Sequence, residues 1–151
     1  MKQILVIATG GTIACRSTEK GLMPQIEMED FLNYVPKIRE MCCLHAVQLM
    51  NLDSTNMQPE NWIAIADTIH KEYDRYDGFV VLHGTDTMAY TAAALSYLIQ
   101  NSRKPIVLTG AQKPINEDIT DAKSNVIQSI LYATSDAVSY THLTLPTTPY
   151  V

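Results

Sequence analysis

The sequence has little cysteine, and its three cysteines follow no functional spacing. Cys15 stands alone, and Cys42 is followed directly by Cys43. Neither a disulfide framework nor a set of metal ligands has this spacing, so we expect no metal site and a reducing compartment. We expect the thiols to be buried and to pack as small apolar side chains.

Basic side chains and long apolar runs are also scarce. Eleven Lys and Arg against sixteen Asp and Glu give a formal net charge of −5, which argues against a nucleic-acid partner. No cationic run indicates binding to a membrane. The apolar run near the N-terminus, Ile4–Ala8, has only five residues. Because this is too short for the core of a signal peptide, the chain is predicted to stay in the cytoplasm.

Short apolar runs alternate with helical patterns along the 151 residues, a length that suits one domain with a sizeable core. Strands are expected at 3–8, 44–52, 79–82 and 105–109. Helices are expected at 27–35, from Pro59 to Ile69, at 88–99, and from Asp121, as a cap, to 133. Residues 15–25 show no periodicity and are predicted to form a mobile loop. This order predicts an α/β fold of three layers, a mainly parallel sheet flanked by helices, as in flavodoxin-like or Rossmann-like domains.

In the helix that starts at Pro59, a set of large or apolar residues recurs at helical spacing and is expected to face the sheet: Trp62, Ile63, Ile65, Ala66 and Ile69. The helix start itself is favoured by proline in the first turn and by the acidic Glu60 near the positive end of the helix dipole.

Residues 138–151 do not continue this pattern. A fifth parallel strand is expected here, yet the segment contains four threonines and two prolines, Pro146 and Pro149, and neither proline fits a central strand. One interpretation is an irregular C-terminal tail. We favour another, that the segment is not native, because it resembles translated sequencing-adapter read-through. The domain would then comprise residues 1–137 and would be incomplete, a truncated sheet.

Four polar loops follow the four predicted strands: Thr9–Thr12, Asp53–Asn56, His83–Thr87 and Gly110–Gln112. Carboxyl ends of parallel strands share one edge of a sheet, where ligands bind. Hydroxyls, a carboxylate and backbone N–H groups at this edge suit acyl transfer on a small zwitterion.

Three of these loops also have a simpler interpretation. The Thr-Gly-Gly-Thr sequence at 9–12 is typical of a tight turn and lacks the spacing of a phosphate or dinucleotide loop. Asp53, Ser54 or Asp86 fits a helix cap equally well. His83, in turn, is more typical of a packed or hydrogen-bonded loop residue than of a catalytic base.

Two segments together take the interpretation further. Ala8–Ala14 (ATGGTIA) and His83–Met88 (HGTDTM) resemble the two signature segments of the bacterial L-asparaginase family. The segments 53–62 and 77–98 look most like its cytoplasmic type I branch. The resemblance runs from Met1 to about Asp136 and implies the N-terminal, active-site-bearing domain. It also implies L-asparagine as substrate, no cofactor, and a homodimer or homotetramer for the full-length protein.

The resemblance implies a role for each matching residue. Thr12 matches the nucleophile that attacks the side-chain amide of L-asparagine, forming a β-aspartyl ester and releasing ammonia. Thr85 matches the threonine of a proton relay with a lysine. Asp86 matches the carboxylate that holds the substrate α-ammonium.

The remaining matches concern substrate binding. Ser54 matches the residue that binds the α-carboxylate, and Thr55 lies beside it. Ala111 matches the position whose carbonyl accepts from the substrate amide.

Two departures from the family pattern stand out. Leu22 occupies the position where a loop tyrosine often lies. No catalytic lysine can be assigned, and neither Lys113 nor Lys123 is a substitute. The chain as given is therefore predicted to have little or no activity. Two alternatives stay open: the amidase subunit of a glutamyl-tRNA amidotransferase, which usually has an extra domain before the first signature, and a non-catalytic flavodoxin-like binding module.

Overall fold

The computed structural model describes residues 1–18, 21–24 and 33–136. The tail at 138–151 and most of the helix expected at 27–35 lie outside the described residues. Within them, the main sheet has four parallel strands in the order β4-β1-β5-β6. Their bounds are β1 Gln3–Gly10, β4 Cys43–Leu52, β5 Gly78–Leu82 and β6 Ile106–Thr109. All four predicted strands are confirmed.

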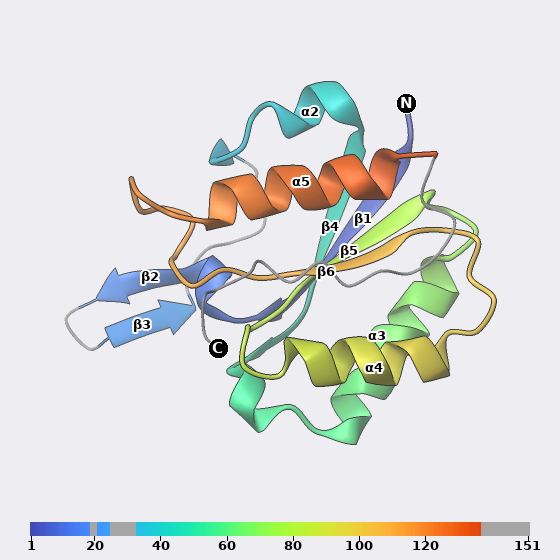
Figure 1. Cartoon of the computed structure of the whole chain (residues 1–151), viewed down its shortest axis with the longest axis horizontal. Helices are drawn as coiled ribbons and strands as arrows, with labels where there is room; N and C mark the ends of the chain where they lie inside the picture. The colour runs from blue at the N-terminus through green and yellow to red at the C-terminus, as the bar shows by residue number, and fades with distance from the viewer. Residues whose placement is uncertain (19–20, 25–32, 137–151) are drawn as a thin grey trace.

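Helices cover both faces of this sheet (Figure 1). On one face lie α2 (Ile38–Met41) and α5 (Ala122–Thr134), and on the other lie α3 (Pro59–Glu72) and α4 (Met88–Leu98). Side chains that alternate along β1 enter two separate cores. Ile4 and Val6 pack with α5, whereas Leu5 and Ile7 pack with α3 and α4. Burial on both faces explains why the central strands are apolar throughout, and the predicted three-layer α/β architecture is confirmed.

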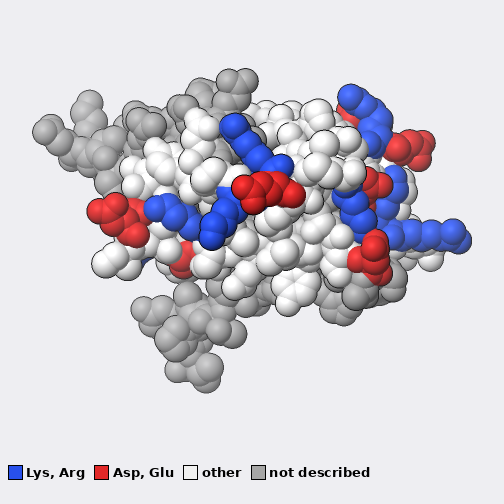
Figure 2. Space-filling view, turned by 90° about the horizontal axis from the view of Figure 1, so that it is seen from above, with Lys and Arg blue, Asp and Glu red and all other residues white. Residues whose placement is uncertain are grey.

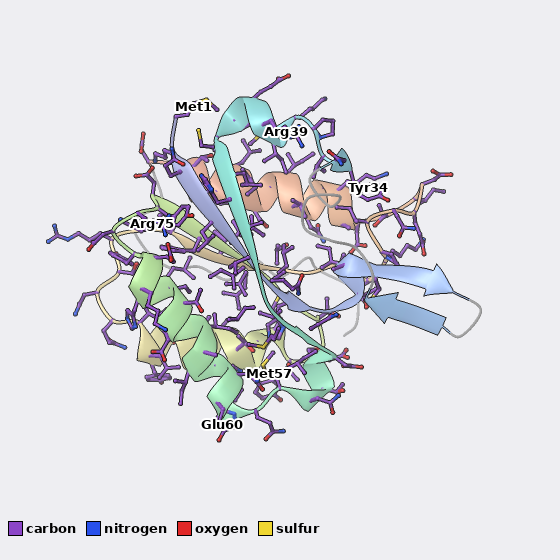
Figure 3. The ribbon with its side chains drawn as sticks, turned by 180° about the vertical axis from the view of Figure 1, so that it is seen from behind. Met1, Tyr34, Arg39, Met57, Glu60 and Arg75 are labelled. Atoms are coloured by element: carbon purple, nitrogen blue, oxygen red, sulfur yellow. The ribbon has the colours of Figure 1, made fainter. Side chains whose placement is uncertain are left out.

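Helix α3 corrects one prediction. Ile65, Ala66 and Ile69 are buried against the sheet, but Ile63 is 50% exposed. An α-helix turns by about 100° per residue, so the side chain of Ile63 points almost opposite to that of Ile65. Figure 3 shows α3 beneath the edge strand β4, with Glu60 labelled at its first turn.

A β-hairpin replaces part of the loop predicted at 15–25. Strands β2 (Cys15–Thr18) and β3 (Gly21–Pro24) pair antiparallel, from Cys15 opposite Pro24 to Thr18 opposite Gly21. The hairpin projects beyond the end of β1, away from the main sheet (Figure 1). Each strand has only four residues, and the two pair with each other rather than with the main sheet, so the sequence shows too short a run to reveal them.

Two short 3-10 helices lie at the carboxyl ends of strands, η1 (Thr12–Ala14) after β1 and η2 (Ser54–Asn56) after β4. None of the described helices is long and apolar enough to cross a membrane. On the face seen in Figure 2, basic and acidic side chains lie next to one another.

Candidate active site

The loops after all four strands of the main sheet border one cavity of about 400 Å³. Four of the residues proposed from the sequence line it: Thr12, Ser54, Thr85 and Asp86. The structure therefore brings together side chains that are up to 74 positions apart in the chain. The same wall also includes side chains that were not proposed as site residues from the sequence: Cys15, Asp53 and Gln112.

Glycine backbone forms the floor of the cavity. Gly11 has a positive φ of 82°, and a Cβ placed on it would lie 2.6 Å from the backbone N of Gly84. A Cβ on Gly84 would in turn lie 2.5 Å from the Ser54 Oγ. Any side chain at these two positions would push the loops apart, so glycine here lets three loops meet at close range.

The turn that carries Thr12 is held through its neighbour Gly11. The Gly11 N–H donates to the Leu52 carbonyl at 3.2 Å, and the Gly11 carbonyl accepts from the Ala14 N–H at 3.2 Å. The Cys15 thiol donates to the same carbonyl at 3.3 Å. Burial, and then the charge of Asp53, raise the pKa of Cys15, so this thiol stays protonated and is a poor nucleophile.

The loop after β4 confirms the capping interpretation for Asp53. Its carboxylate accepts from the Thr55 N–H and from the Thr55 hydroxyl, both at 2.9 Å, and these bonds lower the pKa of Asp53. Thr55 is exposed and is not among the residues that line the cavity. Ser54 is buried, and its carbonyl accepts from the Thr87 hydroxyl at 2.8 Å, which joins the two loops.

The alternative interpretation of Asp86, a cap at the start of α4, is wrong. Thr87 is the residue that precedes the helix, and its side chain makes no capping hydrogen bond, since the hydroxyl donates to Ser54 instead. Asp86 is exposed at the cavity wall. It therefore borders the same space as Thr12.

The loop after β6 corrects the role predicted for Asp121. This residue precedes α5 but makes no side-chain cap. Its carboxylate instead accepts from the backbone N–H groups of Gln112, at 2.9 Å, and Lys113, at 3.1 Å. With its backbone held in this way, Gln112 donates from Nε2 to the Thr85 Oγ1 at 3.1 Å. A sequence pattern cannot distinguish this loop contact from a cap, because both place an acid directly before a helix.

Two further positions named from the sequence lie outside the cavity lining. Ala111 is buried, and Lys113 is exposed with its backbone bound to Asp121. The ammonium of Lys123 donates to the Glu117 carbonyl at 3.3 Å. Among the lining residues, the charged ones are Asp53 and Asp86, so the wall formed by this part of the chain is acidic.

His83 confirms the interpretation of a packed, hydrogen-bonded residue. It is completely buried, and its ring nitrogens contact the Gly84 carbonyl and the Thr91 hydroxyl. Burial lowers the pKa of His83, which favours the neutral ring at physiological pH.

Comparison with known proteins identifies the domain. The family described as "Asparaginase, N-terminal" matches residues 3–144. The chain is 42% identical over 132 residues to an L-asparaginase of Thermococcus kodakarensis, covering 87% of this chain and 40% of that protein. It is also 42% identical over 139 residues to a glutamyl-tRNA(Gln) amidotransferase subunit of Pyrococcus abyssi, covering 90% of this chain and 32% of that one.

A solved structure agrees with these matches. The L-asparaginase I of Vibrio cholerae superposes with a TM-score of 0.88 at 36% identity, covering 96% of this chain and 44% of that one. The chain thus spans about two fifths of the length of the L-asparaginase relatives it matches. A family match over almost its whole length, on a fold of the same kind, shows that the chain belongs to the asparaginase family.

Proposed function

We propose that this chain carries the active site of an amidohydrolase that converts L-asparagine to L-aspartate and ammonia. One observation carries the proposal: Thr12, Ser54, Thr85 and Asp86 come from three separate loops and line a single cavity. Two relatives named L-asparaginase are 42% and 41% identical to the chain over this region. The activity is proposed for the whole protein, of which this chain is the part that carries these side chains.

In the proposed reaction, the Thr12 Oγ attacks the side-chain amide carbon of the substrate. The C–N bond breaks, the hydroxyl proton passes to the leaving nitrogen, and ammonia departs from a β-aspartyl ester. Water then attacks the ester carbon, releasing L-aspartate and returning a proton to Thr12. A threonine hydroxyl needs a proton acceptor for this attack, because its own pKa is far above neutral.

Thr85 is the proposed relay in this proton transfer. The Gln112 amide donates to the Thr85 Oγ1, so one lone pair of that oxygen is occupied and the Thr85 proton is free to be donated elsewhere. Gln112 therefore fixes the orientation of a hydroxyl that must pass a proton in one direction.

The charge of the cavity supports recognition of an amino acid. Both charged lining residues, Asp53 and Asp86, are acidic, which favours the substrate α-ammonium, and we assign that group to Asp86. We assign the α-carboxylate to the Ser54 hydroxyl and the substrate amide to the Ala111 carbonyl. The Thr55 hydroxyl already donates to the Asp53 carboxylate. We therefore propose that Thr55 holds this carboxylate away from the substrate.

Titration of the chain with L-asparagine, followed by amide NMR and calorimetry, tests the proposal. Binding is the primary measurement because little ammonia release is expected from this chain alone. Asp86→Asn should weaken binding about 30-fold or more, since it leaves the bound ammonium without its charge partner. Asp67→Asn is the matched control, because Asp67 is exposed on α3 and does not line the cavity. Thr12→Ala should retain binding and abolish any ammonia release.

Two outcomes would overturn the proposal. In one, saturating L-asparagine leaves the amide signals of Thr12, Ser54 and Thr85 in place. In the other, Asp86→Asn and Asp67→Asn have the same effect on affinity.

A second candidate is the amidase subunit of a glutamyl-tRNA amidotransferase, favoured by the match to the Pyrococcus abyssi protein. The amide chemistry would be the same, but the ammonia would pass to a partner enzyme. Tighter binding of L-glutamine than of L-asparagine would favour this candidate. For either function we propose a cytoplasmic protein, in keeping with three free cysteines, and for the full-length asparaginase a homodimer or homotetramer.

A further inference from the structure

A line of hydrogen bonds connects helix α3 to the loop that carries Thr85. The Trp62 Nε1 donates to the Thr91 Oγ1 at 2.9 Å, and that oxygen lies 2.9 Å from the Nε2 of His83. The Nδ1 of the same ring lies 2.7 Å from the Gly84 carbonyl oxygen. His83 and Thr91 are both 0% exposed, so water does not compete for the contacts of the His83 ring.

The chemistry of the groups fixes the direction of every bond in this line. A carbonyl oxygen only accepts, so the proton of the His83 ring must be on Nδ1. An indole N–H only donates, so the Thr91 Oγ1 accepts from Trp62 and gives its own proton to the His83 Nε2. The neutral ring in the Nδ1–H tautomer is the single state that satisfies all of these groups.

Thr91 differs from the other serines and threonines inside α3, α4 and α5. The usual partner of such a hydroxyl is a carbonyl three or four residues earlier, as for Ser96 and Ser124, which bond three residues back. The bond to the carbonyl four residues earlier is made by Thr68 to Ala64 at 2.8 Å, by Ser129 to Asn125 at 2.7 Å and by Thr134 to Ile130 at 2.9 Å. In the described structure Thr91 makes no such bond, because its hydroxyl proton goes to His83.

The end of the line is a peptide of the cavity wall. Gly84 and Thr85 both line the cavity, and their peptide bond is trans, as are all described peptide bonds. In a trans peptide the C=O and N–H groups point in opposite directions. Holding the Gly84 carbonyl toward the His83 ring therefore fixes the Thr85 N–H on the other side, and with it the direction in which the Thr85 side chain leaves the backbone.

We propose that His83 is a positioning residue of the active site: held by Trp62 and Thr91 in the Nδ1–H tautomer, it sets the orientation of the Gly84–Thr85 peptide and thus of the Thr85 hydroxyl. The importance of that orientation for catalysis rests on the proposed function. The hydrogen bonds themselves, and their effect on the loop, are independent of the proposed function.

Nitrogen NMR of the histidine rings in the unmodified chain is the first test. His83 should show a protonated, pyrrole-like Nδ1 and an unprotonated, pyridine-like Nε2 at pH 7.5. A ring protonated on Nε2, or on both nitrogens, would overturn the proposal. This measurement uses no substrate, so it stands whether or not L-asparagine binds.

Substitutions at Thr91 test the effect on the loop. Thr91→Val keeps the shape of the side chain but removes the hydroxyl, and should shift the amide signals of Gly84 and Thr85 and remove the fixed tautomer. Thr91→Ser restores the hydroxyl and should restore both. Thr68→Val is the matched control, because it removes a helix hydroxyl that donates only to a backbone carbonyl, and it should leave the Thr85 signal in place.

The variants decide between a positioning role and simple packing. Equal shifts of the Thr85 amide in Thr91→Val and Thr91→Ser, or none in either, would refute the positioning role. Should Thr91→Val not fold, Trp62→Phe gives the same decision: it removes the indole N–H at the far end of the line, and an unchanged His83 ring signal would contradict the proposed direction. L-asparagine titration of the unmodified chain then tests the proposed function separately.

Discussion

Replacing Gly11 by alanine should destabilise the fold strongly, because the added methyl group meets backbone at the cavity floor. The new Cβ would lie 2.6 Å from the Gly84 N and 2.7 Å from its Cα, both of which are backbone atoms that cannot move without the whole loop. The φ of 82° and ψ of 168° at Gly11 lie in a region that essentially only glycine adopts, which costs an alanine about 1–3 kcal/mol, and overpacking typically adds about 1–3 kcal/mol. We therefore expect a loss of about 2–6 kcal/mol in the free energy of unfolding.

Urea denaturation followed by the fluorescence of Trp62, the single tryptophan, measures this loss. With a slope of about 2 kcal/mol per molar urea, the midpoint of unfolding should fall by roughly 1–3 M. Gln112→Ala is the control: it changes the same cavity wall but removes only a hydrogen bond, and should lower the midpoint by less than about 0.5 M. A Gly11→Ala midpoint equal to that of the control would show that the loops have room to separate, and would refute the close approach of Gly11 to Gly84.

Two further predictions concern polar groups that hold the loops. Asp121→Ala should lower the free energy of unfolding by about 1–3 kcal/mol, because the Gln112 and Lys113 N–H groups lose a charged acceptor, and NMR should show both amides shifted. For His83, burial lowers the pKa, so the unfolded chain takes up a proton at higher pH than the folded chain. Stability should be full above about pH 6.5 and decrease below it, toward the pKa of the folded state, by at most about 1.4 kcal/mol per pH unit. Urea midpoints at several pH values should lose this decrease in His83→Gln but keep it in His70→Gln, where the ring is exposed.

The strands of the main sheet could be predicted from the sequence because their burial is nearly complete. All five residues of β5 are buried, and a run of apolar residues followed by a helical pattern has few other interpretations. Strands β2 and β3 and helix α2 have only four residues each. An element this short does not complete a periodic pattern, so composition does not reveal it.

The site could be predicted at the level of loops but not at the level of individual contacts. Parallel strands bring their carboxyl ends to one edge, and this rule is sufficient to place Thr12, Ser54, Thr85 and Asp86 together. It does not determine which neighbour in a tight turn faces the ligand. Ser54 lines the cavity, whereas the next residue, Thr55, is exposed outside it.

Long-range partners could not be predicted at all. Asp121 binds a backbone N–H nine positions earlier, and His83 contacts a helix hydroxyl eight positions later. Both residues have an ordinary local interpretation, a cap and a packed loop residue. The actual partners depend on how close α5 and α4 lie to the loops. That distance is set only when the helices pack on the sheet.

The side chains of the site fall into two physical groups, and this division leads to a last prediction. Thr87 and His83 each bond a backbone carbonyl of another site residue, so removing them should weaken both the fold and the geometry of the site. The Thr12 and Asp86 side chains make no hydrogen bond to any described residue and are left for a ligand.

Thr12→Ala and Asp86→Asn should therefore change the free energy of unfolding by no more than about 0.5 kcal/mol, while Asp86→Asn abolishes most of the ligand affinity. Urea denaturation of these two variants beside Thr87→Val measures the contrast. If Thr12→Ala destabilised the chain as strongly as Thr87→Val, its hydroxyl would be part of the structural network, and its assignment as the nucleophile would lose its physical basis. A hydroxyl whose proton goes to a structural backbone carbonyl, as that of Thr87 does, cannot pass that proton to the acceptor that nucleophilic attack requires.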